Sequence, residues 1–209
     1  MLEPVETRDD VDVLPGAEDY GQVPRRLLAS AVRCFAANGF HGTTTRDIAA
    51  GAGLSPAALY VHVPSKELAL YEIVRLGHRH AHDILSDPGI QALADPGERL
   101  AALVAAYTRF HARRHVIARV CQYDLGALSP EHYDAVLRIR HETNEIFRLA
   151  VAAGVDAGDF SPDLDVRRIS RALISLVIDL VRWYRPDGPE TPEQLGDFNA
   201  GVALRMVAR

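Results

Sequence analysis

The sequence predicts an all-α fold of about nine helices. From residue 24 onward, apolar residues recur at the i, i+4, i+8 spacing of one helix face. No stretch alternates polar and β-branched residues between hairpin turns, the pattern that is typical of strands. Segments rich in Pro, Gly and Asp, such as SPDLD and RPDGPETP, separate the periodic stretches. With 48% hydrophobic and 24% charged residues, the chain of 209 residues can bury a globular core.

The first 19 residues are acidic and lack apolar periodicity, so we expect a disordered tail over 1–19. This tail holds seven acids and one arginine (−6), whereas the whole chain is −5, so the remainder sums to +1. Residues 20–67 carry five basic and two acidic side chains, a local charge of +3. A phosphate backbone responds to local charge, so the net charge does not exclude a nucleic-acid partner.

Two helices are expected first. One runs from about residue 24 and ends at Gly39, with its apolar side formed by residues such as Leu27, Ala31 and Phe35. The next begins with Thr44 as N-cap and Asp47 in the capping-box position, and glycines at 51 and 53 end it. These signals predict two amphipathic helices joined by a short turn.

A third and a fourth helix follow. Ser55 and Pro56 form an N-cap followed by a first-turn proline, which opens a helix through about His62. Ser65, with Glu67 in the first turn, starts a longer helix to about residue 85. Beyond the Asp-Pro-Gly sequence at 87–89, five more helices are expected at roughly 97–113, 116–128, 130–153, 165–184 and 191–207.

Residues 44–66 have the features of a helix-turn-helix. Two short helices that cross steeply need a small residue at the crossing, a turn glycine able to take positive φ, and buried apolar anchors. Ala49, Gly53 and the pair Ile48 and Leu59 supply these features in order. In such a unit the second helix lies in the major groove of DNA. We therefore predict that this segment binds double-stranded DNA.

The segment from Arg25 to Leu70 resembles the DNA-binding domain of the TetR family of transcriptional regulators. The likeness rests on F-A-x-x-G-F at 35–40, T-x-R-D-I-A at 44–49, L-S-x-x-x-L-Y-x-H at 54–62, and S-K-E-L at 65–68. Residue 63 is Val, where family members often carry Phe. Both side chains are apolar, so this difference leaves the resemblance intact. The resemblance implies a DNA-binding domain over 20–70 and a ligand-binding and dimerisation domain over 71–209.

The DNA contacts are expected on both short helices. Arg46 is the long donor placed to read a guanine, while Tyr60, His62 and Lys66 would hold backbone phosphates. Small residues at the start of the second helix carry little base-specific chemistry, so the operator sequence stays open. The complete expected set is Thr44, Thr45, Arg46, Ser55, Pro56, Ala57, Ala58, Tyr60, His62 and Lys66.

The remaining two thirds are expected to bind a small-molecule effector and to form a homodimer. The stretch 172–181 is apolar almost all round, as expected of a helix that faces its own core and a second subunit. With the last helix it would build an intersubunit four-helix bundle. Aromatic and soft side chains in the middle helices are the candidate ligand contacts: Tyr107, Phe110, His111, Cys121, Phe147 and Trp183.

The chain end adds a shorter likeness. Residues 181–195, VRWYRPDGPETPEQL, resemble the end of actinobacterial TetR-type repressors of fatty-acid and sterol catabolism, some of which answer to acyl-CoA thioesters. This resemblance implies an apolar effector, with an acyl-CoA as the candidate. Arg109, Arg113 and Arg114 would then be available to hold a coenzyme A phosphate. We expect such a ligand to release a repressor from its operator.

Other function classes find less support. The sequence lacks G-x-S-x-G, HExxH, a P-loop and a dinucleotide-binding glycine turn, so we expect no catalytic residue, no cofactor and no enzyme activity. Histidines at 78 and 82, and at 111 and 115, are spaced to share a metal but have no third ligand in register. The alternative function is a helical dimer that binds a small molecule or partner protein and keeps a vestigial DNA-binding end.

The compartment follows from the apolar pattern. The run at 172–181 is interrupted by Asp179 and is half as long as a bilayer needs, and the N-terminus carries acids where a signal peptide carries Lys or Arg. We therefore expect a cytoplasmic protein without a membrane partner. Cys34 and Cys121 lack the spacing of a metal site or disulfide framework and are expected to be core thiols.

Overall fold

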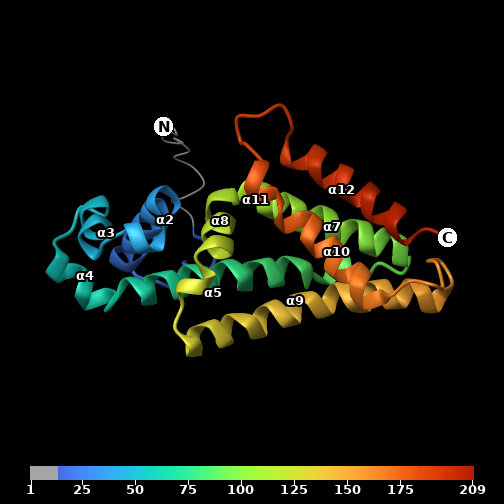
Figure 1. Cartoon of the computed structure of the whole chain (residues 1–209), viewed down its shortest axis with the longest axis horizontal. Coiled ribbons are helices and arrows are strands. Elements are labelled where there is room, and N and C mark those ends of the chain that lie inside the picture. Colours follow the sequence, from blue (N-terminus) through green and yellow to red (C-terminus); the bar gives the residue numbers. More distant parts are fainter. Residues whose placement is uncertain (1–13) are drawn as a thin grey trace. The chain divides into compact units, whose positions relative to one another are not determined.

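A computed structural model of the chain describes residues 14–209, and within that range every regular element is a helix (Figure 1). The chain divides into two compact units. Unit 1 comprises the residues up to 80 together with 116–138, and unit 2 comprises 81–115 and 139–209. The elements are α2 (Gln22–Gly42), α3 (Thr45–Gly51), α4 (Pro56–His62), α5 (Lys66–Leu85), α6 (Pro88–Gln91), α7 (Pro96–Arg113), α8 (His115–Tyr123), the 3₁₀ helix η1 (Leu125–Ala127), α9 (Pro130–Ala157), α10 (Val166–Ile178), α11 (Leu180–Trp183) and α12 (Pro192–Val207).

The all-α prediction is confirmed, and each expected helix has a counterpart. The expected helix at 165–184 is interrupted at Asp179, whose N–H is shared between the carbonyls of Ser175 and Val177, and so it becomes α10 and α11. The helix expected at 116–128 ends at Tyr123 and continues as a 3₁₀ turn. The Asp-Pro-Gly sequence at 87–89 opens the short helix α6, which was not expected, because the Asp87 carboxylate caps it and a proline follows at its first position.

Residues 14–19 differ from the prediction of a disordered tail. Leu14 and Ala17 are buried in the core of unit 1, and the N–H of Ala17 donates to the carbonyl of Leu14 in a tight turn. Next to this turn, the Tyr20 hydroxyl donates to Glu72, which also pairs with Arg75 at 2.6 Å. The two apolar side chains are three residues apart, so a single turn can bury both. Their burial outweighs the tendency of the acidic composition toward disorder. Residues 1–13 of the predicted tail lie outside the described residues.

Unit 1 is built around the apolar face of α2. Leu27, Ala31 and Phe35 are buried, as the periodicity predicts. Gly39 takes φ +69° and ψ 169°, so the regular helix stops there as expected, and one further turn follows to residue 42. The N–H of Phe40, in that turn, donates to the carboxylate of Asp124 at 3.1 Å. The end of α2 is thus held by a residue that follows α8.

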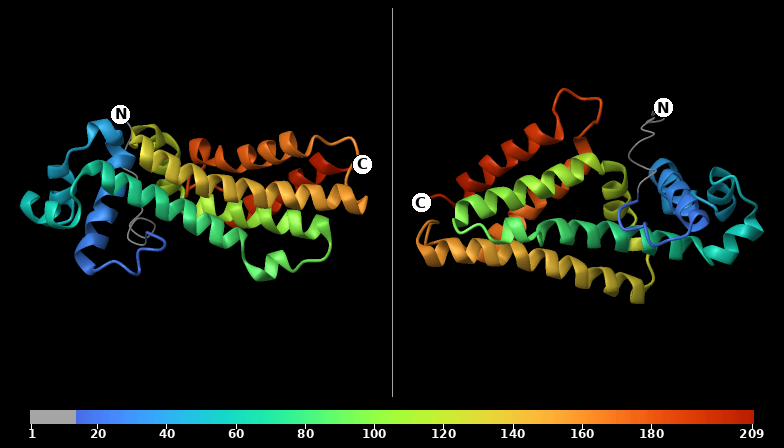
Figure 2. Two further views of the ribbon diagram at one scale, coloured as in Figure 1. Left: turned by 90° about the horizontal axis from the view of Figure 1, so that it is seen from below. Right: turned by 180° about the vertical axis from the view of Figure 1, so that it is seen from behind.

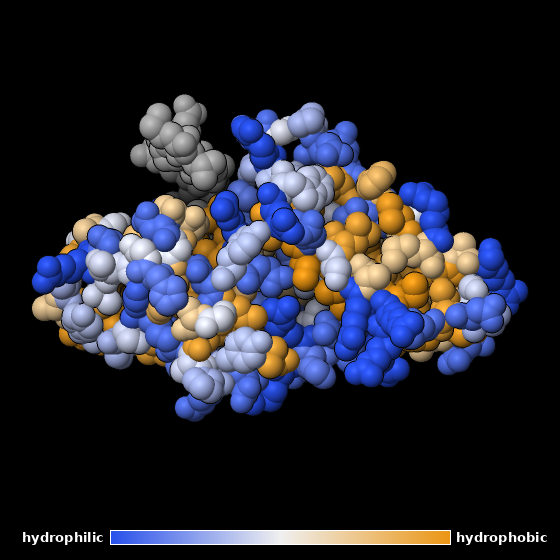
Figure 3. Space-filling model, in the orientation of Figure 1, coloured by the Kyte–Doolittle hydropathy of each residue, from blue (hydrophilic) through white to orange (hydrophobic). Residues whose placement is uncertain are grey.

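Unit 2 is a helical layer in which α7, α10 and α12 lie side by side (Figures 1 and 2). Its core holds Leu103, Phe147 and Leu173, each fully buried. A polar contact lies within this packing, where the amide of Asn199 donates to the Thr108 hydroxyl at 3.2 Å. Hydrophobic residues also gather on the outer face over α10 and α12 (Figure 3). Within residues 14–209, no helix combines the length and apolar character that crossing a bilayer requires.

Candidate nucleic-acid interface

Both short helices of unit 1 begin with the expected caps. The Thr44 hydroxyl accepts from the N–H of Asp47 at 3.2 Å, and the Asp47 carboxylate accepts from the Thr44 N–H at 2.8 Å, which completes the capping box. Ser55 accepts from the N–H of Ala58 at 3.2 Å, and Pro56 occupies the first position of α4. These caps define where α3 and α4 start, so the adjacent side chains project from ordered helix ends.

The crossing of α3 and α4 uses the predicted residues. Ile48, Ala49 and Leu59 have at most 1% of their surface exposed. Gly53 has φ +66°, the left-handed conformation that the turn needs and that glycine adopts without strain. At Gly51 an added Cβ would lie 2.4 Å from the Ser30 hydroxyl, so only glycine permits α3 to approach α2 this closely.

Polar and aromatic side chains project from the outer side of this unit. Arg46 and His62 are exposed, and Tyr60 keeps 52% of its surface in solvent. The hydroxyls of Thr45 and Tyr60 lie 3.1 Å apart and share a hydrogen bond between α3 and α4. The structure therefore brings four of the expected DNA contacts onto one continuous helix-turn-helix.

Small residues cover the start of α4. Pro56 and Ala57 are exposed, and Ala58 is half-buried. They present methyl and methylene groups without hydrogen-bond donors, which suits close backbone approach and contact with a thymine methyl.

Lys66 occupies a more buried position than the sequence suggested. Its ammonium donates to the carbonyls of Phe40 and Thr43, both at 2.8 Å, and lies 4.3 Å from the centre of the Phe40 ring. These contacts satisfy two of the three N–H donors of the ammonium and bond the carbonyls of Phe40 and Thr43 at the end of α2. The geometry therefore gives Lys66 a structural function at the junction of α2, α3 and α5, whereas its expected phosphate contact stays a prediction.

Four of the six expected ligand contacts come together in the core of unit 2. Tyr107, Phe110 and Phe147 are buried there, and the Tyr107 and Phe147 rings lie 5.7 Å apart. The buried ring of His111 meets Tyr107 edge-on, with centroids 4.4 Å apart, and its Nδ1 lies 2.9 Å from the Tyr107 carbonyl. Burial lowers the pKa of His111 from 6.5 to about 4, so the ring is neutral near pH 7.

Cys121 and Trp183 do not join this cluster. Cys121 is buried in the core of unit 1, where its thiol lies 3.9 Å from the carbonyl of Ile73. Trp183, on α11, is 51% exposed and lines an open groove with Leu176 and Phe198. Both were expected as ligand contacts because of their residue type, but residue type does not distinguish one core from another or a core from a surface groove.

The arginines considered for a coenzyme A phosphate mostly have other partners. Arg109 pairs with Asp197 of α12 at 2.6 Å, and Arg113 pairs with Glu193 of the same helix. A carboxylate already neutralises each of these two guanidinium groups. Among residues 14–209, no three His, Cys, Asp or Glu side chains are grouped as a metal ion would require.

Comparison with known proteins covers almost the whole chain. Residues 27–71 match the model of bacterial regulatory proteins of the tetR family, and residues 93–207 match a tetracyclin repressor-like C-terminal domain. The chain belongs to the TetR family. It is 34% identical over 200 residues to the HTH-type transcriptional repressor KstR2 of Mycobacterium tuberculosis, covering 90% of this chain and 96% of that protein.

Solved structures of the family agree with this assignment. A tetR-family regulatory protein from Rhodococcus RHA1 superposes with a TM-score of 0.84 and is 38% identical, over 90% of this chain and 98% of that one. The ketosteroid transcriptional regulator KstR2 of Mycobacterium tuberculosis gives a TM-score of 0.82 at 30% identity, over 89% and 95% of the two chains. The protein is accordingly a ligand-responsive, DNA-binding transcriptional regulator with a TetR-type helix-turn-helix.

One contact of this TetR-type unit had no signal in the sequence. Glu67, in the first turn of α5, accepts from the N–H of Ser129 at 2.9 Å and from the His132 ring at 2.8 Å, and Tyr71 stacks on that ring at 3.9 Å. Burial alone would raise the pKa of Glu67, but the Ser129 and His132 hydrogen bonds outweigh it and lower the pKa. The start of α5 is thereby anchored to the start of α9, 62 to 65 residues away in the chain.

Proposed function

We propose that this regulator is a repressor whose operator contacts are the exposed side chains of α3 and α4. The observation that carries the proposal is the grouping of exposed Arg46, Tyr60 and His62 on two short, capped helices. The guanidinium of Arg46 can donate two parallel hydrogen bonds to a guanine, while hydroxyl and imidazole groups can hold phosphate oxygens. The likeness to KstR2 supports the repressor activity. The protein would act in the cytoplasm, because its operator DNA lies there.

We further propose that the effector is a small apolar ligand, with an acyl-CoA as the candidate, and that its binding releases the operator. The aromatic cluster around His111 in unit 2 supports an apolar ligand, because buried rings and a neutral imidazole favour uncharged groups. A relative at 30% identity is a ketosteroid transcriptional regulator, which also points to an apolar effector. α5 is the route proposed for the signal, because this single helix contributes residues to both units.

The proposed homodimer would form through the face of α10 and α12. Of the apolar residues expected there, Leu173, Val177 and Val181 are buried in their own unit, whereas Ile174, Leu176 and Ile178 are half-buried. Beside them a groove of about 700 Å³ is lined by exposed Trp183 and Phe198 among other residues. An exposed apolar groove of this kind favours coverage by a second copy.

Replacing Arg46 with Ala tests the proposed base contact. We expect operator affinity to fall by about 1–3 kcal/mol, because a bidentate guanine contact is lost, while affinity for random DNA changes little. The preference at one base pair should also become flat in a binding-site selection. The DNA upstream of the gene that encodes this protein is the first probe to test.

Tyr60→Phe serves as the matched variant, because it removes one hydroxyl from the same surface without removing a base contact. It should weaken binding about equally on operator and random DNA. If Arg46→Ala kept the full sequence preference, Arg46 would not read a base. If the wild-type protein bound no upstream DNA at all, the vestigial DNA-binding alternative would be favoured.

Ligand release is tested by titrating the protein–operator complex with an acyl-CoA. We expect about a hundredfold loss of DNA affinity, which corresponds to about 2.7 kcal/mol of coupling between the two sites. A ligand that binds both states equally would shift nothing, so this loss measures differential binding directly. Free coenzyme A and the free fatty acid are the controls. Equal release by all three, or by none, would contradict the proposed effector class.

A further inference from the structure

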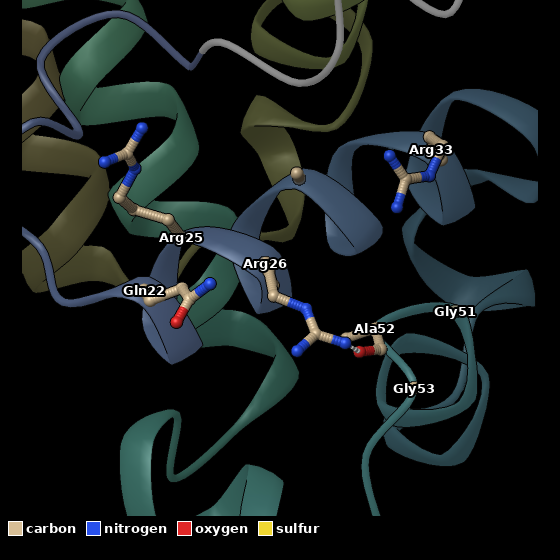
Figure 4. Close-up of a pocket in the computed structure, with 8 residues that line it drawn as sticks. Gln22, Arg25, Arg26, Arg33, Gly51, Ala52 and Gly53 are labelled. Atoms are coloured by element: carbon tan, nitrogen blue, oxygen red, sulfur yellow. Dashed lines mark hydrogen bonds between the residues drawn. The ribbon is translucent and has the colours of Figure 1, made fainter.

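A basic groove lies between α2 and the turn of the helix-turn-helix (Figure 4). Its volume is about 540 Å³. One wall is formed by α2 residues at the i, i+4, i+7, i+11 spacing of a single helix face, and Arg25 lies at its edge. The opposite wall is the turn that precedes α4. The lining residues are Gln22, Arg25, Arg26, Ala29, Arg33, Gly51, Ala52 and Gly53.

The groove concentrates positive charge. Three of its lining residues are arginines and none is acidic, although the whole chain has a net charge of −5. All three arginines are exposed. Guanidinium groups match the oxygen spacing of a phosphate and bind it with charge-assisted hydrogen bonds. The groove therefore suits a phosphate group better than an apolar or cationic ligand.

Arg26 links the positive charge of the groove to the turn that precedes α4. One of its terminal N–H groups donates to the carbonyl of Ala52 at 2.5 Å, as the dashed line in Figure 4 shows. At Gly53 an added Cβ would lie 3.1 Å from the same guanidinium nitrogen, so a side chain there would crowd Arg26 as well as strain the turn. The charge is thus fixed at Ala52, three residues before Ser55, the N-cap of α4. The small lining residues Ala29, Gly51 and Gly53 leave room for an approaching phosphate.

We propose that this groove binds a backbone phosphate of the operator, as a contact additional to those of α3 and α4. The proposal rests on the proposed DNA-binding function and extends it to α2. Arg33 and Arg26 supply the charge, and the Gln22 amide adds a neutral donor. A phosphate held here would lie beside the turn that positions α4, so the contact would fix orientation without reading sequence.

The salt dependence of DNA affinity tests the proposal. Each phosphate contact adds about 0.9 to the slope of log affinity against log salt, so Arg33→Ala should lower that slope by about 0.9 per groove. The loss of affinity relative to wild type should then shrink about 3.5-fold per groove between 50 and 200 mM salt. The loss should be equal on operator and random DNA. Arg33→Lys keeps the charge and should keep the slope.

Arg119→Ala is the matched control. Arg119 is an exposed arginine of unit 1 that lines a different hollow, beside Tyr123 and Asp124. Arg119→Ala changes the net charge by the same amount as Arg33→Ala but lies outside the proposed groove. The salt-dependence slope of this variant should therefore stay at the wild-type value. An unchanged slope for Arg33→Ala, with normal operator binding, would overturn the groove contact and leave the proposed function standing. An equal drop for both variants would also overturn it, and a wild-type protein that binds no DNA would overturn both proposals.

Discussion

Acidification from pH 6.5 to about pH 4 should lower the free energy of unfolding by about 3 kcal/mol through His111 alone. Burial lowers the pKa of this ring, and the hydrogen bond with the Tyr107 carbonyl offsets only part of the effect. The His111 ring therefore stays neutral in the folded protein, while in the unfolded chain the same ring takes up a proton. The contribution is complete above the unfolded pKa and is lost as the pH falls toward the folded pKa.

Urea unfolding at several pH values between 7 and 4.5 measures this effect. Many carboxylates also titrate in this range, so the informative quantity is the difference between wild type and His111→Leu. That difference should shift by up to about 3 kcal/mol in favour of the variant as the pH falls. His141→Leu, at an exposed histidine of α9, is the control and should follow the wild type. A difference that does not depend on pH would show that His111 is not held neutral by burial.

Replacing Gly154 with Ala should destabilise unit 2 by about 1–3 kcal/mol, even though alanine is the better helix former. An added Cβ would lie 2.2 Å from two ring atoms of Phe160, which is buried. The ring cannot withdraw easily, because the N–H of Phe160 and that of Asp159 both donate to the Gly154 carbonyl at 3.0 Å. The end of α9 would have to shift to admit one methyl group.

Gly201→Ala provides the comparison, since it makes the same change inside α12. There the nearest atom to an added Cβ is the end of the flexible Arg205 side chain at 3.5 Å. This variant should be as stable as wild type or more stable, by up to about 1 kcal/mol, because glycine costs helix stability. Chemical denaturation of both variants checks the pair. Equal stability of the two would show that Phe160 can yield without cost.

Much of unit 1 was predictable from the sequence because its signals are local. Thr44 and Ser55 mark helix starts by capping their own first turns, and Gly53 marks the turn by its backbone freedom. Such interactions span three or four residues, so their spacing is visible along the chain. The positions of the exposed side chains on α3 and α4 then follow from helix geometry.

Other features depend on contacts that the sequence does not reveal. The Glu67 and His132 pair joins residues 65 apart, and no pattern links them. The turn within 14–19 was not predicted, because the acidic composition of the segment outweighed the signal of its two buried apolar residues. Cys121 and Trp183 have side chains of the kind that line ligand cavities, but which core or groove each one meets is decided by tertiary packing.

The hydrogen bond between the Thr45 and Tyr60 hydroxyls has a thermodynamic consequence for recognition. A free side chain on a protein surface loses rotamer entropy when a ligand fixes it, at a cost of about 0.5–1.5 kcal/mol for each one immobilised. Here each hydroxyl already restricts the other before any DNA arrives. If these two side chains contact the operator as proposed, part of the ordering cost of binding is met during folding, by two residues that α3 and α4 bring together.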